Sequence, residues 1–444
     1  GFDTAALGRR RAMTSLRGSI WTIRNQECGS HYRVSESSVH GGVAEGADWF
    51  IAICPTTRRS SPMCVTGRRE PAKPGCDVVL VVTDVYKYGY NLVRAGWGAR
   101  GTRMKADVTV IGAGVIGAHT AVQLLERGLS VVLVDPGSPG GEQAASYGNA
   151  AWLSSHSVLP PAFPGAWRRV PKWLLDPLGP LTVRASHLPR ALPWLLRYLS
   201  AASTEEKLRA TARHLRALLV DAPSLHAEIA ARAGLSHLID AKSGLMHVYR
   251  DRAAYEADAF GWDIRRELGI ACEEIEAEEL ALLQPELSSD YRFGVYVPEA
   301  GQCRNPGAYC AGLVAHAERH GARRVAARAL SFREGGGRLK AVLTTQGEIE
   351  CDATVIAAGA RAGSLAAKAG DRVPLESERG YHFTVEGGSN LPGPSTSVML
   401  GDRKVVVTRL DNGVRCAGQV EIAQLVAGDT PEIDLAPFSA ARFR

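Results

Sequence analysis

The spacing of hydrophobic residues changes abruptly near Met104. Downstream of it, the apolar run Asp107–Gly112 predicts a buried strand, and the helical spacing of apolar residues over Val115–Arg127 predicts a helix that ends at Gly128. A second apolar run, Leu129–Val134, predicts another buried strand. A strand, a helix and a strand within about 30 residues indicate a β-α-β unit with parallel strands.

Farther along the chain, helical and strand patterns alternate. Residues 151–240 are mostly helical, with amphipathic stretches at Leu192–Ser200 and Glu205–Ala231, and Asn305-Pro306 is a helix-start signal. Beyond residue 240 the pattern predicts helices over Ala253–Leu268, Ala277–Leu283 and Asn305–Gly321. It predicts strands over Gly244–Arg250, Phe293–Pro298, Leu339–Thr345, Glu348–Cys351, Thr354–Ala358, Tyr381–Val385, Ser397–Leu400, Lys404–Arg409 and Val414–Val420, the last four alternating as in an antiparallel sheet.

Residues 1–103 follow neither period. Arginine clusters such as Arg9-Arg10-Arg11 and Arg58-Arg59 lie there among Ser, Thr, Gly and Cys. We therefore expect the native protein to start at or near Met104 and residues 1–103 to be a disordered or non-native extension. A targeting or partner-binding arm is the alternative.

The chain of 444 residues has room for two or three domains and a substantial core. Its formal net charge is +6, but residues 1–103 hold 15 basic and 8 acidic residues, which leaves 37 basic and 38 acidic residues in the rest. The predicted folded part is therefore close to neutral. A nearly neutral body without a basic stripe argues against a nucleic-acid partner.

The nine cysteines are scattered and include no C-x-x-C pair. This spacing excludes a zinc or thioredoxin-like site and is typical of reduced thiols in a cytoplasmic protein, with no metal expected. No apolar run reaches the length of about 18 residues that spans a bilayer, so we expect no transmembrane segment.

The turn between the first strand and the first helix carries a glycine motif. Gly112, Gly114 and Gly117 form G-x-G-x-x-G, and Asp135 ends the next strand. In a dinucleotide fold the first glycine makes the tight turn, the second admits the pyrophosphate and the third lets the helix pack on the strand. The helix N-terminus attracts phosphate, and the acid suits the adenosine ribose.

Later segments favour FAD over NAD. A nicotinamide domain usually continues with further βα units, whereas here Ser146–Ala151 leads into a long helical insert. The chain also has the Asn305-Pro306 helix, a hairpin and strand over 347–359, and the segments 379–382, 405–412 and 418–421, of which the first reads Arg379-Gly380-Tyr381-His382. With these features it resembles the D-amino-acid oxidase superfamily over roughly 104–430. The bacterial D-amino-acid dehydrogenase small-subunit branch is the most similar.

The resemblance assigns cofactor contacts to particular positions. Gly112, Gly114 and Gly117 would hold the FAD pyrophosphate and Asp135 the adenosine ribose. Ser146 and Asn149 would lie along the flavin side of the cofactor, Val325 would contact adenine, and Ala358 and Gly359 would border the cofactor again. Ala151 stands where many relatives have glycine, which departs from the pattern.

The resemblance also suggests substrate-site candidates. In this chemistry the flavin takes a hydride from the α-carbon, and the protein positions the substrate and binds its carboxylate. The candidates are Tyr381, Arg379, Arg409 and His156, with His382 beside them.

These observations predict an α/β protein in which a discontinuous Rossmann-type FAD domain accompanies an α+β substrate domain on a mixed or antiparallel sheet. The expected parts are 104–190 and 300–375 for FAD, 191–299 and 376–430 for substrate, and a tail at 431–444 that departs from the family pattern. The C-terminal segment that closes over the flavin in the family is expected to be missing.

The expected reaction is the oxidative deamination of a D-amino acid to a 2-oxo acid and ammonia. Sarcosine-, glycine- or proline-type amine oxidation, and an impaired FAD-binding remnant, are the alternatives. The expected electron acceptor is a respiratory-chain component, and the expected location is the cytoplasm, with peripheral contact to the inner membrane. The oligomeric state stays open.

Overall fold

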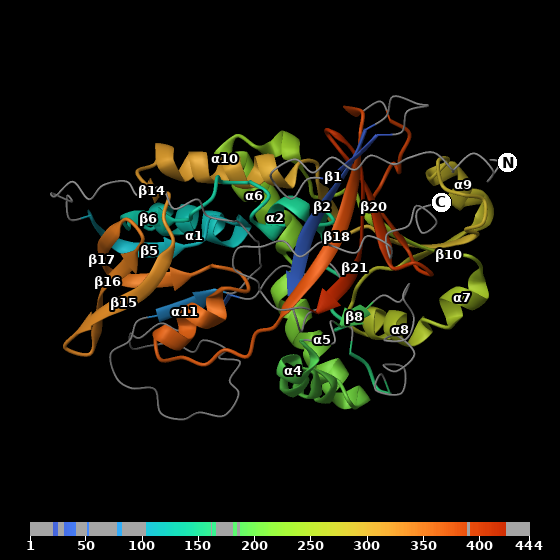
Figure 1. The fold of residues 1–444 in the computed structure, drawn as a ribbon. Helices are drawn as coiled ribbons and strands as arrows, with labels where there is room; N and C mark the ends of the chain where they lie inside the picture. Colours follow the sequence, from blue (N-terminus) through green and yellow to red (C-terminus); the bar gives the residue numbers. More distant parts are fainter. Residues whose placement is uncertain are drawn as a thin grey trace.

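The computed structural model describes residues 104–160, 162–165, 187–388 and 391–422 (Figure 1). It also describes five strands outside these ranges: β1 (Trp21–Arg24), β2 (His31–His40), β3 (Ile51–Ala52), β4 (Val78–Val81) and β8 (Leu181–Val183). Two sheets dominate the structure, one on each side of Figure 1, and each is covered by its own helices.

The first sheet joins the two predicted parts of the cofactor domain. Its strands run in the order β14 (Arg323–Val325), β6 (Val131–Val134), β5 (Met104–Ile111), β17 (Gly347–Ile356), β16 (Arg338–Thr344) and β15 (Ala329–Gly335). β14, β6, β5 and β17 are parallel neighbours, while β17, β16 and β15 form an antiparallel meander. The predicted β-α-β unit is confirmed: helix α1 (Val115–Glu126) connects β5 to β6 along the chain, and the two strands are parallel neighbours in the sheet.

Helices cover both faces of this sheet because its strands are apolar on both faces. α1 and α10 (Pro306–Arg319) pack on one face, where Val108, Val110 and Leu313 belong to the same buried cluster. α11 (Ala362–Lys368) packs on the other face, against Ile111 and Ile356 among others.

The second sheet is mixed, as expected. Antiparallel pairing links β18 (Ser377–Glu386), β21 (Gly413–Ile422), β20 (Val405–Leu410) and β19 (Val398–Leu400) in that order. β19 then pairs in parallel with β10 (Leu245–Tyr249), which continues antiparallel to β12 (Phe293–Val297) and β11 (Glu273–Glu276). A small separate sheet joins β7 (Trp152–Leu153), β13 (Gly301–Cys303) and β9 (Ile239–Asp240).

The helical insert supplies the cover of the second sheet. α5 (Glu205–Leu219) and α8 (Ala259–Glu267) bury Leu208 and Trp262 against one face, and α9 (Ala277–Leu283) buries Leu280 against the other. α4 (Leu188–Ala201) precedes α5, and α7 (Arg252–Glu256) precedes α8. None of the helices in the described ranges is long and apolar enough to cross a membrane.

Two predicted helices are wrong in their continuity. Glu205–Ala231 is not one helix: α5 ends at Leu219, and α6 (Ala222–Ala233) follows with Pro223 in its first turn. Proline has no amide to donate, so it fits the first turn of a new helix rather than the interior of an old one. The predicted helix Ala253–Leu268 is likewise two helices, α7 and α8. The Asp251 side chain caps the start of α7.

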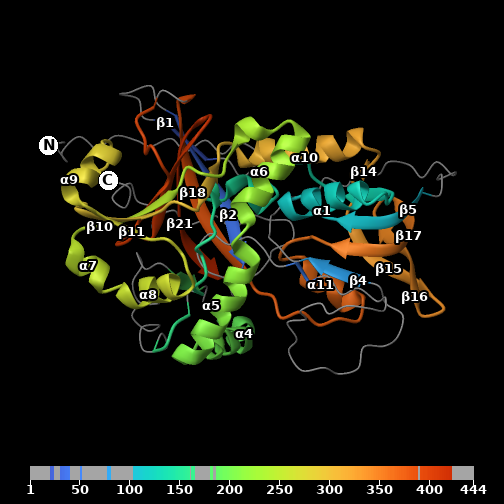
Figure 2. The ribbon, with the colours of Figure 1, turned by 180° about the vertical axis from the view of Figure 1, so that it is seen from behind.

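Other boundaries differ as well. The strands predicted at 348–351 and 354–358 are one strand, β17. Its first residues pair with β16, and its residues from Ile349 to Ile356 pair with β5. The short strands β7, β9, β11, β13, β14 and the strand β15 were not predicted, because runs of two to seven residues carry little period. α6 packs into the same buried hydrophobic cluster as α1 and α10 (Figure 2). Residues 191–299, which include α6, were expected to belong to the substrate domain.

The segment before residue 104 contains strands that its sequence pattern did not predict. β2 pairs antiparallel with β18 from Ser377↔His40 to Val385↔Tyr32, and β4 pairs in parallel with β17. Each of the two sheets therefore receives two strands from this segment, β1 and β2 in one and β3 and β4 in the other. β2 lies beside β18 in both views (Figures 1 and 2). The remainder of residues 1–103, and residues 431–444, lie outside the described residues.

A buried polar chain joins α1, α10 and α6. The His119 Nδ1 donates to the Val115 carbonyl oxygen at 2.8 Å, so its Nε2 accepts from the Tyr309 hydroxyl at 3.1 Å. The Tyr309 oxygen in turn lies 3.1 Å from the His226 Nδ1, which donates to it. Burial lowers the pKa of His119 to about 4, which keeps the ring neutral and allows this pattern.

The start of α10 provides a test of the helix-start signal predicted at Asn305-Pro306. The Asn305 side chain accepts a hydrogen bond from the Ala308 amide at 3.0 Å, and Pro306 occupies the first turn. We expect Asn305→Ala to lower the free energy of unfolding by about 1 kcal/mol, because a capping acceptor is lost. Urea unfolding measures this change, and Asn305→Asp, which keeps the acceptor, should stay close to the parent. Equal losses in both variants would contradict the capping role.

Candidate cofactor and substrate site

The glycine turn packs so tightly that two of its three glycines are required by the protein itself. Gly112 has φ +107°, and a Cβ there would lie 2.1 Å from the Ala357 carbonyl oxygen. A Cβ on Gly117 would lie 1.8 Å from the Gly112 carbonyl oxygen. These contacts bring α1 directly onto the ends of β5 and β17.

Gly114 is different. A Cβ there would make a tight contact of 3.3 Å with Ser146 Oγ and lie 3.9 Å from Ala144 Cβ, so this position is much less crowded than the other two. Gly114 is also the residue that precedes the first turn of α1. An open backbone at a helix N-terminus is a suitable place for a phosphate.

Asp135 lies at the end of β6, beside this turn. Its two carboxylate oxygens accept hydrogen bonds from the backbone amides of Ala113 and Gly137, each at 2.8 Å. Burial raises the pKa of Asp135, and these two amide bonds oppose the increase. Each oxygen retains further acceptor capacity, which suits ribose hydroxyl donors.

Ser146 fastens the next segment to the helix. It belongs to the short helix α2 (Ala145–Gly148), and its Oγ accepts from the Val115 amide at 3.0 Å. Asn149 follows α2, and its side-chain oxygen accepts from the Ala151 amide at 2.9 Å. Ala151 has φ +61°, a left-handed conformation that favours glycine, which gives a physical meaning to the departure seen in the sequence.

The remaining predicted cofactor positions also border the turn. The Val325 carbonyl oxygen accepts from the Asp135 amide at 3.1 Å, which places the end of β14 beside the acid. Ala358 and Gly359 follow β17, next to the Ala357 carbonyl that contacts Gly112, and Gly359 has φ +61°. The structure thus brings the predicted positions together around the ends of β5, β6 and β17.

This arrangement fits FAD. The open Gly114 and the first turn of α1 would hold the pyrophosphate, and the Asp135 carboxylate would accept from the adenosine ribose. The segment from Ser146 to Ala151 leads from this cradle toward the second sheet, because the Thr408 hydroxyl of β20 donates to the Ala150 carbonyl oxygen at 2.9 Å.

Sequence reasoning missed Arg415. This buried side chain of β21 donates from Nη1 to the carbonyl oxygens of Tyr147 at 2.8 Å and of Asn149 at 3.0 Å. It therefore holds the same segment from the side of the second sheet. The only sign of this in the sequence was the place of Arg415 in the alternating strand predicted over Val414–Val420, at a position that faces the interior.

Arg379 and Tyr381 share a partner that was also missed. The Glu421 carboxylate of β21 accepts from the Tyr381 hydroxyl at 2.8 Å and from Arg379 Nη1 at 3.3 Å. All three side chains are buried, and β18, which carries two of them, lies between the two parts of the molecule (Figure 1). The structure therefore gathers a cation, an anion and a hydroxyl in one cluster.

His156 lies inside the core of the second part. Its Nε2 is 2.9 Å from the Nε2 of His247, and its Nδ1 is 3.1 Å from Ser154 Oγ. Burial lowers the pKa of His156 to about 3, and burial also lowers the pKa values of His247 and His382 well below the usual range. A neutral ring in a packed cluster with Trp152 and Trp262 has a clear structural role, and its catalytic role stays a prediction.

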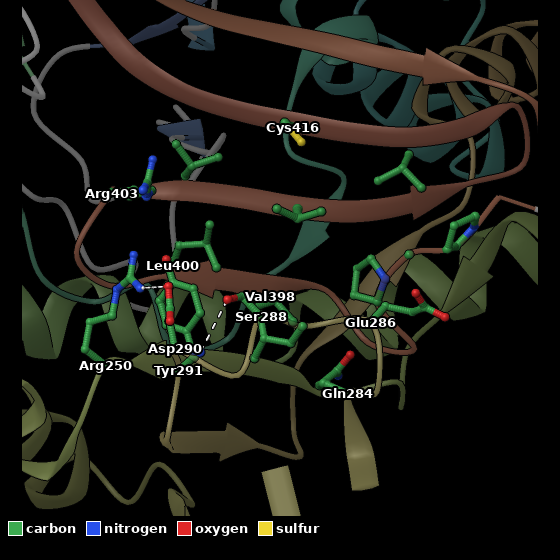
Figure 3. Close-up of a pocket in the computed structure, with 17 residues that line it drawn as sticks. Arg250, Gln284, Glu286, Ser288, Asp290, Tyr291, Val398, Leu400, Arg403 and Cys416 are labelled. Atoms are coloured by element: carbon green, nitrogen blue, oxygen red, sulfur yellow. Dashed lines mark hydrogen bonds and ion pairs between the residues drawn. The ribbon is translucent and has the colours of Figure 1, made fainter. Parts of the chain in front are cut away.

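Arg409 holds the wall of a pocket. Its guanidinium donates to the carbonyl oxygens of Leu391 and Gly393, and the Nε lies 3.4 Å from that of Pro394. The pocket has a volume of about 510 Å³ and lies between β19–β21 and the segment after α9 (Figure 3). Side chains of the three strands line it with charged groups: Val398, Leu400, Val405, Val407, Val414 and Cys416, then Arg250, Asp290 and Arg403 at one end and Glu286 at the other (Figure 3).

The pocket and the cofactor segment lie on opposite faces of the second sheet. Neighbouring residues of a strand point to opposite faces. Cys416 lines the pocket, whereas Arg415 contacts the backbone of Tyr147 and Asn149. In the same way, Thr408 points toward the cofactor segment and its neighbour Arg409 points toward the pocket. A catalytic role for Arg409 stays a prediction.

The glycines give a prediction in which folding and cofactor binding separate. We expect Gly114→Ala to lower the melting temperature less than Gly117→Ala but to weaken FAD binding at least tenfold, because its Cβ enters the space proposed for the pyrophosphate. Gly117→Ala should instead unfold at a clearly lower temperature, since its Cβ would clash with the Gly112 carbonyl. Thermal melts of the cofactor-free protein and FAD fluorescence titrations measure the two effects; a Gly114 variant with unchanged FAD affinity would contradict the assignment.

The buried histidines predict sensitivity to mild acid. Burial lowers the pKa values of His119, His156, His226, His247 and His382, whereas an unfolded histidine titrates near pH 6.5. Below that pH the unfolded chain takes up protons that the folded chain does not, so stability falls as the pH falls. We expect a loss of roughly 1 kcal/mol for each such histidine at pH 5.5.

Urea unfolding at pH 7.5, 6.5 and 5.5 measures this loss. His156→Gln should have a shallower pH dependence than the parent, because one neutral ring is removed. A free energy of unfolding that stays constant between pH 7.5 and 5.5 would mean that these rings are not held neutral.

Known proteins resemble this chain over most of its length. A protein named D-amino-acid oxidase from Bradyrhizobium diazoefficiens is 51% identical over 320 residues, which cover 72% of this chain and 75% of that protein. A protein named D-amino acid dehydrogenase 2 from Ralstonia nicotianae is 32% identical over 327 residues, covering 71% and 76%. Among solved structures, glycine oxidase from Geobacillus kaustophilus matches with a TM-score of 0.50 at 20% identity, covering 72% and 71%, which supports the fold alone.

The family model described as FAD dependent oxidoreductase, DAO, matches residues 107–442. The match begins within β5 and includes the glycine turn, Asp135, and the Arg379 and Arg415 positions. The resemblance stated from the sequence is therefore confirmed, and the chain belongs to the DAO family of FAD-dependent oxidoreductases.

Proposed function

We propose that this chain oxidises the C–N bond of a D-amino acid, giving an imine that hydrolyses to a 2-oxo acid and ammonia. The observation that carries the proposal is the 51% identity to a protein named D-amino-acid oxidase over three quarters of that protein's length. The predicted dinucleotide-binding positions, which meet around Gly114 and Asp135, support the FAD-dependent part of the proposal.

Bound FAD would supply the two-electron acceptor for hydrogen removed from the substrate α-carbon. Gly112, Gly114, Gly117 and Asp135 would hold its pyrophosphate and ribose, Val325 would contact its adenine, and Ala358 and Gly359 would border it. Ser146 and Asn149 would lie along its flavin side. The tight packing of Gly112 and Gly117 fixes this cradle before the cofactor arrives.

The Arg379–Glu421 pair is the proposed recognition element for the amino acid. An amino acid is a zwitterion at neutral pH, and a buried cation beside a buried anion matches its two charges. Arg379 would bind the carboxylate and Glu421 the ammonium group, while Tyr381 holds the Glu421 carboxylate through its hydroxyl. In this proposal Arg409 fixes the shape of the loop that contains Leu391 and Gly393, because it donates hydrogen bonds to their carbonyl oxygens.

The electron acceptor is a separate question. The sequence predicts a respiratory-chain component, which fits the relatives named dehydrogenase at 32% identity and below. The greater similarity to a protein named an oxidase favours molecular oxygen. A cytoplasmic location with peripheral contact to the inner membrane stays a prediction, and its membrane part matters only if oxygen is not the acceptor.

An absorbance experiment tests the reaction. The purified chain, loaded with FAD, should show a flavin spectrum that bleaches when D-alanine or D-proline is added without oxygen, because substrate electrons reduce the flavin. Readmitted air should restore the spectrum and yield hydrogen peroxide if oxygen is the acceptor. A dye-linked assay with a quinone analogue measures the other route.

Two controls make the result specific. L-alanine should leave the flavin oxidised, and the Gly114→Ala variant should bind too little FAD to show the spectrum. Bleaching by glycine or sarcosine but by no D-amino acid would replace the proposed substrate class with that of the alternative amines. A loaded flavin that no amine reduces would contradict the proposed reaction.

A further inference from the structure

Arg415 is a buried cation with an unusual set of partners. Its side chain is 4% exposed, and its guanidinium contacts the carbonyl oxygens of Tyr147 and Asn149 and, at 3.4 Å, the Thr384 hydroxyl. It also lies 5.8 Å from the centre of the Tyr147 ring. Every one of these partners is neutral.

Two other arginines that the structure describes as buried or half-buried have an acidic partner. Arg379 pairs with Glu421 at 3.3 Å, and Arg216 pairs with Glu299. Among the residues that the structure describes, no carboxylate lies within ion-pair distance of Arg415. Burial accordingly lowers the pKa of Arg415 to about 10, the direction expected of a charge whose compensation is incomplete.

A buried charge without a counter-charge is costly, and proteins retain one where an anion binds or develops. The two carbonyl oxygens accept from Nη1 of Arg415 but leave its net charge in place. The position of this charge then decides what it can act on.

That position is the cofactor segment. The two carbonyls that Arg415 binds belong to Tyr147 and Asn149, and Asn149 follows Ser146, which is bonded to the first turn of α1. Thr408 holds the next carbonyl, that of Ala150, from the same sheet. Arg415 therefore touches the stretch of backbone that leads from the pyrophosphate cradle along the flavin side.

We propose that Arg415 is a positioning residue that fixes the Tyr147–Asn149 backbone against the flavin and supplies the positive charge that stabilises the reduced cofactor. In the proposed reaction the substrate α-hydrogen would leave with its electron pair as a hydride, which bound FAD would accept, and the amine would become an imine as a proton leaves the nitrogen. Bound FAD would take up negative charge on reduction, and the fixed cation of Arg415, held against the Tyr147 and Asn149 backbone, would make that reduction more favourable. The inference rests on the FAD site of the proposed function and not on which amine is oxidised.

Three variants separate the charge of Arg415 from its contacts. Arg415→Gln removes the charge and keeps one amide donor. Arg415→Lys keeps the charge and loses the forked geometry. Thr384→Val is the matched control, because it removes one hydrogen-bond partner of Arg415 and leaves the charge in place.

The readouts use the FAD-loaded protein without any amino acid. Sulfite forms an anionic adduct with oxidised flavin, so its dissociation constant reports the positive charge near the ring. The midpoint potential against redox dyes reports the same charge independently. We expect Arg415→Gln to bind sulfite at least tenfold more weakly and to have a lower potential, with Arg415→Lys and Thr384→Val within about threefold of the parent in sulfite affinity.

A purely structural role gives a different pattern. Arg415→Gln and Arg415→Lys would then lose FAD affinity and thermal stability together, while the sulfite affinity of the fraction still loaded would match the parent. That outcome would overturn the electrostatic part of the proposal. Unchanged FAD affinity in both variants would overturn the positioning part.

One measurement needs no variant and covers the case in which Arg415→Gln does not fold. If the cation stabilises the anionic reduced flavin, the parent potential should vary with pH between 6.5 and 8 as expected for one proton per two electrons. A dependence of two protons per two electrons would contradict the proposal. Because no substrate takes part, a failure of the proposed amino-acid oxidation would leave these results unchanged.

Discussion

The close contact of three backbone segments at the ends of β5, β17 and the start of α1 is the constraint on which the rest of the structure depends. Gly112 approaches the Ala357 carbonyl, and Gly117 approaches the Gly112 carbonyl, so no side chain fits at either position. This contact sets the direction in which α1 leaves the sheet. It also leaves the backbone at Gly114 open at the helix N-terminus, where Asp135 from the neighbouring strand completes the site.

The short stretch from Ser146 to Leu153 transmits this geometry to the second sheet. One end is bonded to α1 through Ser146, while Arg415, Thr408 and the Cys303 amide hold successive carbonyls of the stretch. Ala151 adopts a left-handed backbone conformation that costs about 1 kcal/mol. The surrounding hydrogen bonds offset that cost, because they fix the carbonyls on both sides of it.

Buried polar groups fall into two classes. Among the histidines that burial keeps neutral, His156 and His247 bond to each other, and His119 and His226 bond to Tyr309, so burial costs them little. The arginines and acids that are buried in the described part of the chain, Glu378, Arg379, Arg415 and Glu421, all lie on β18 and β21. Charge concentrated on two adjacent strands near the cofactor segment fits a site that handles a zwitterionic substrate, since charged groups elsewhere in the core would only destabilise it.

The sequence by itself determined the β-α-β unit, its glycine turn and the acid at the end of the second strand, because hydrophobic period, glycine spacing and strand ends are local properties. It also identified the family, since those local motifs recur together along the chain. Only the tertiary structure decided which residues meet across the sheets: Glu421 with Arg379 and Tyr381, Arg415 with the carbonyls of Tyr147 and Asn149, and α6 with α1 and α10. Those meetings depend on strand order and register between segments as much as 268 residues apart, as for Arg415 and Tyr147. No local period in the sequence encodes them.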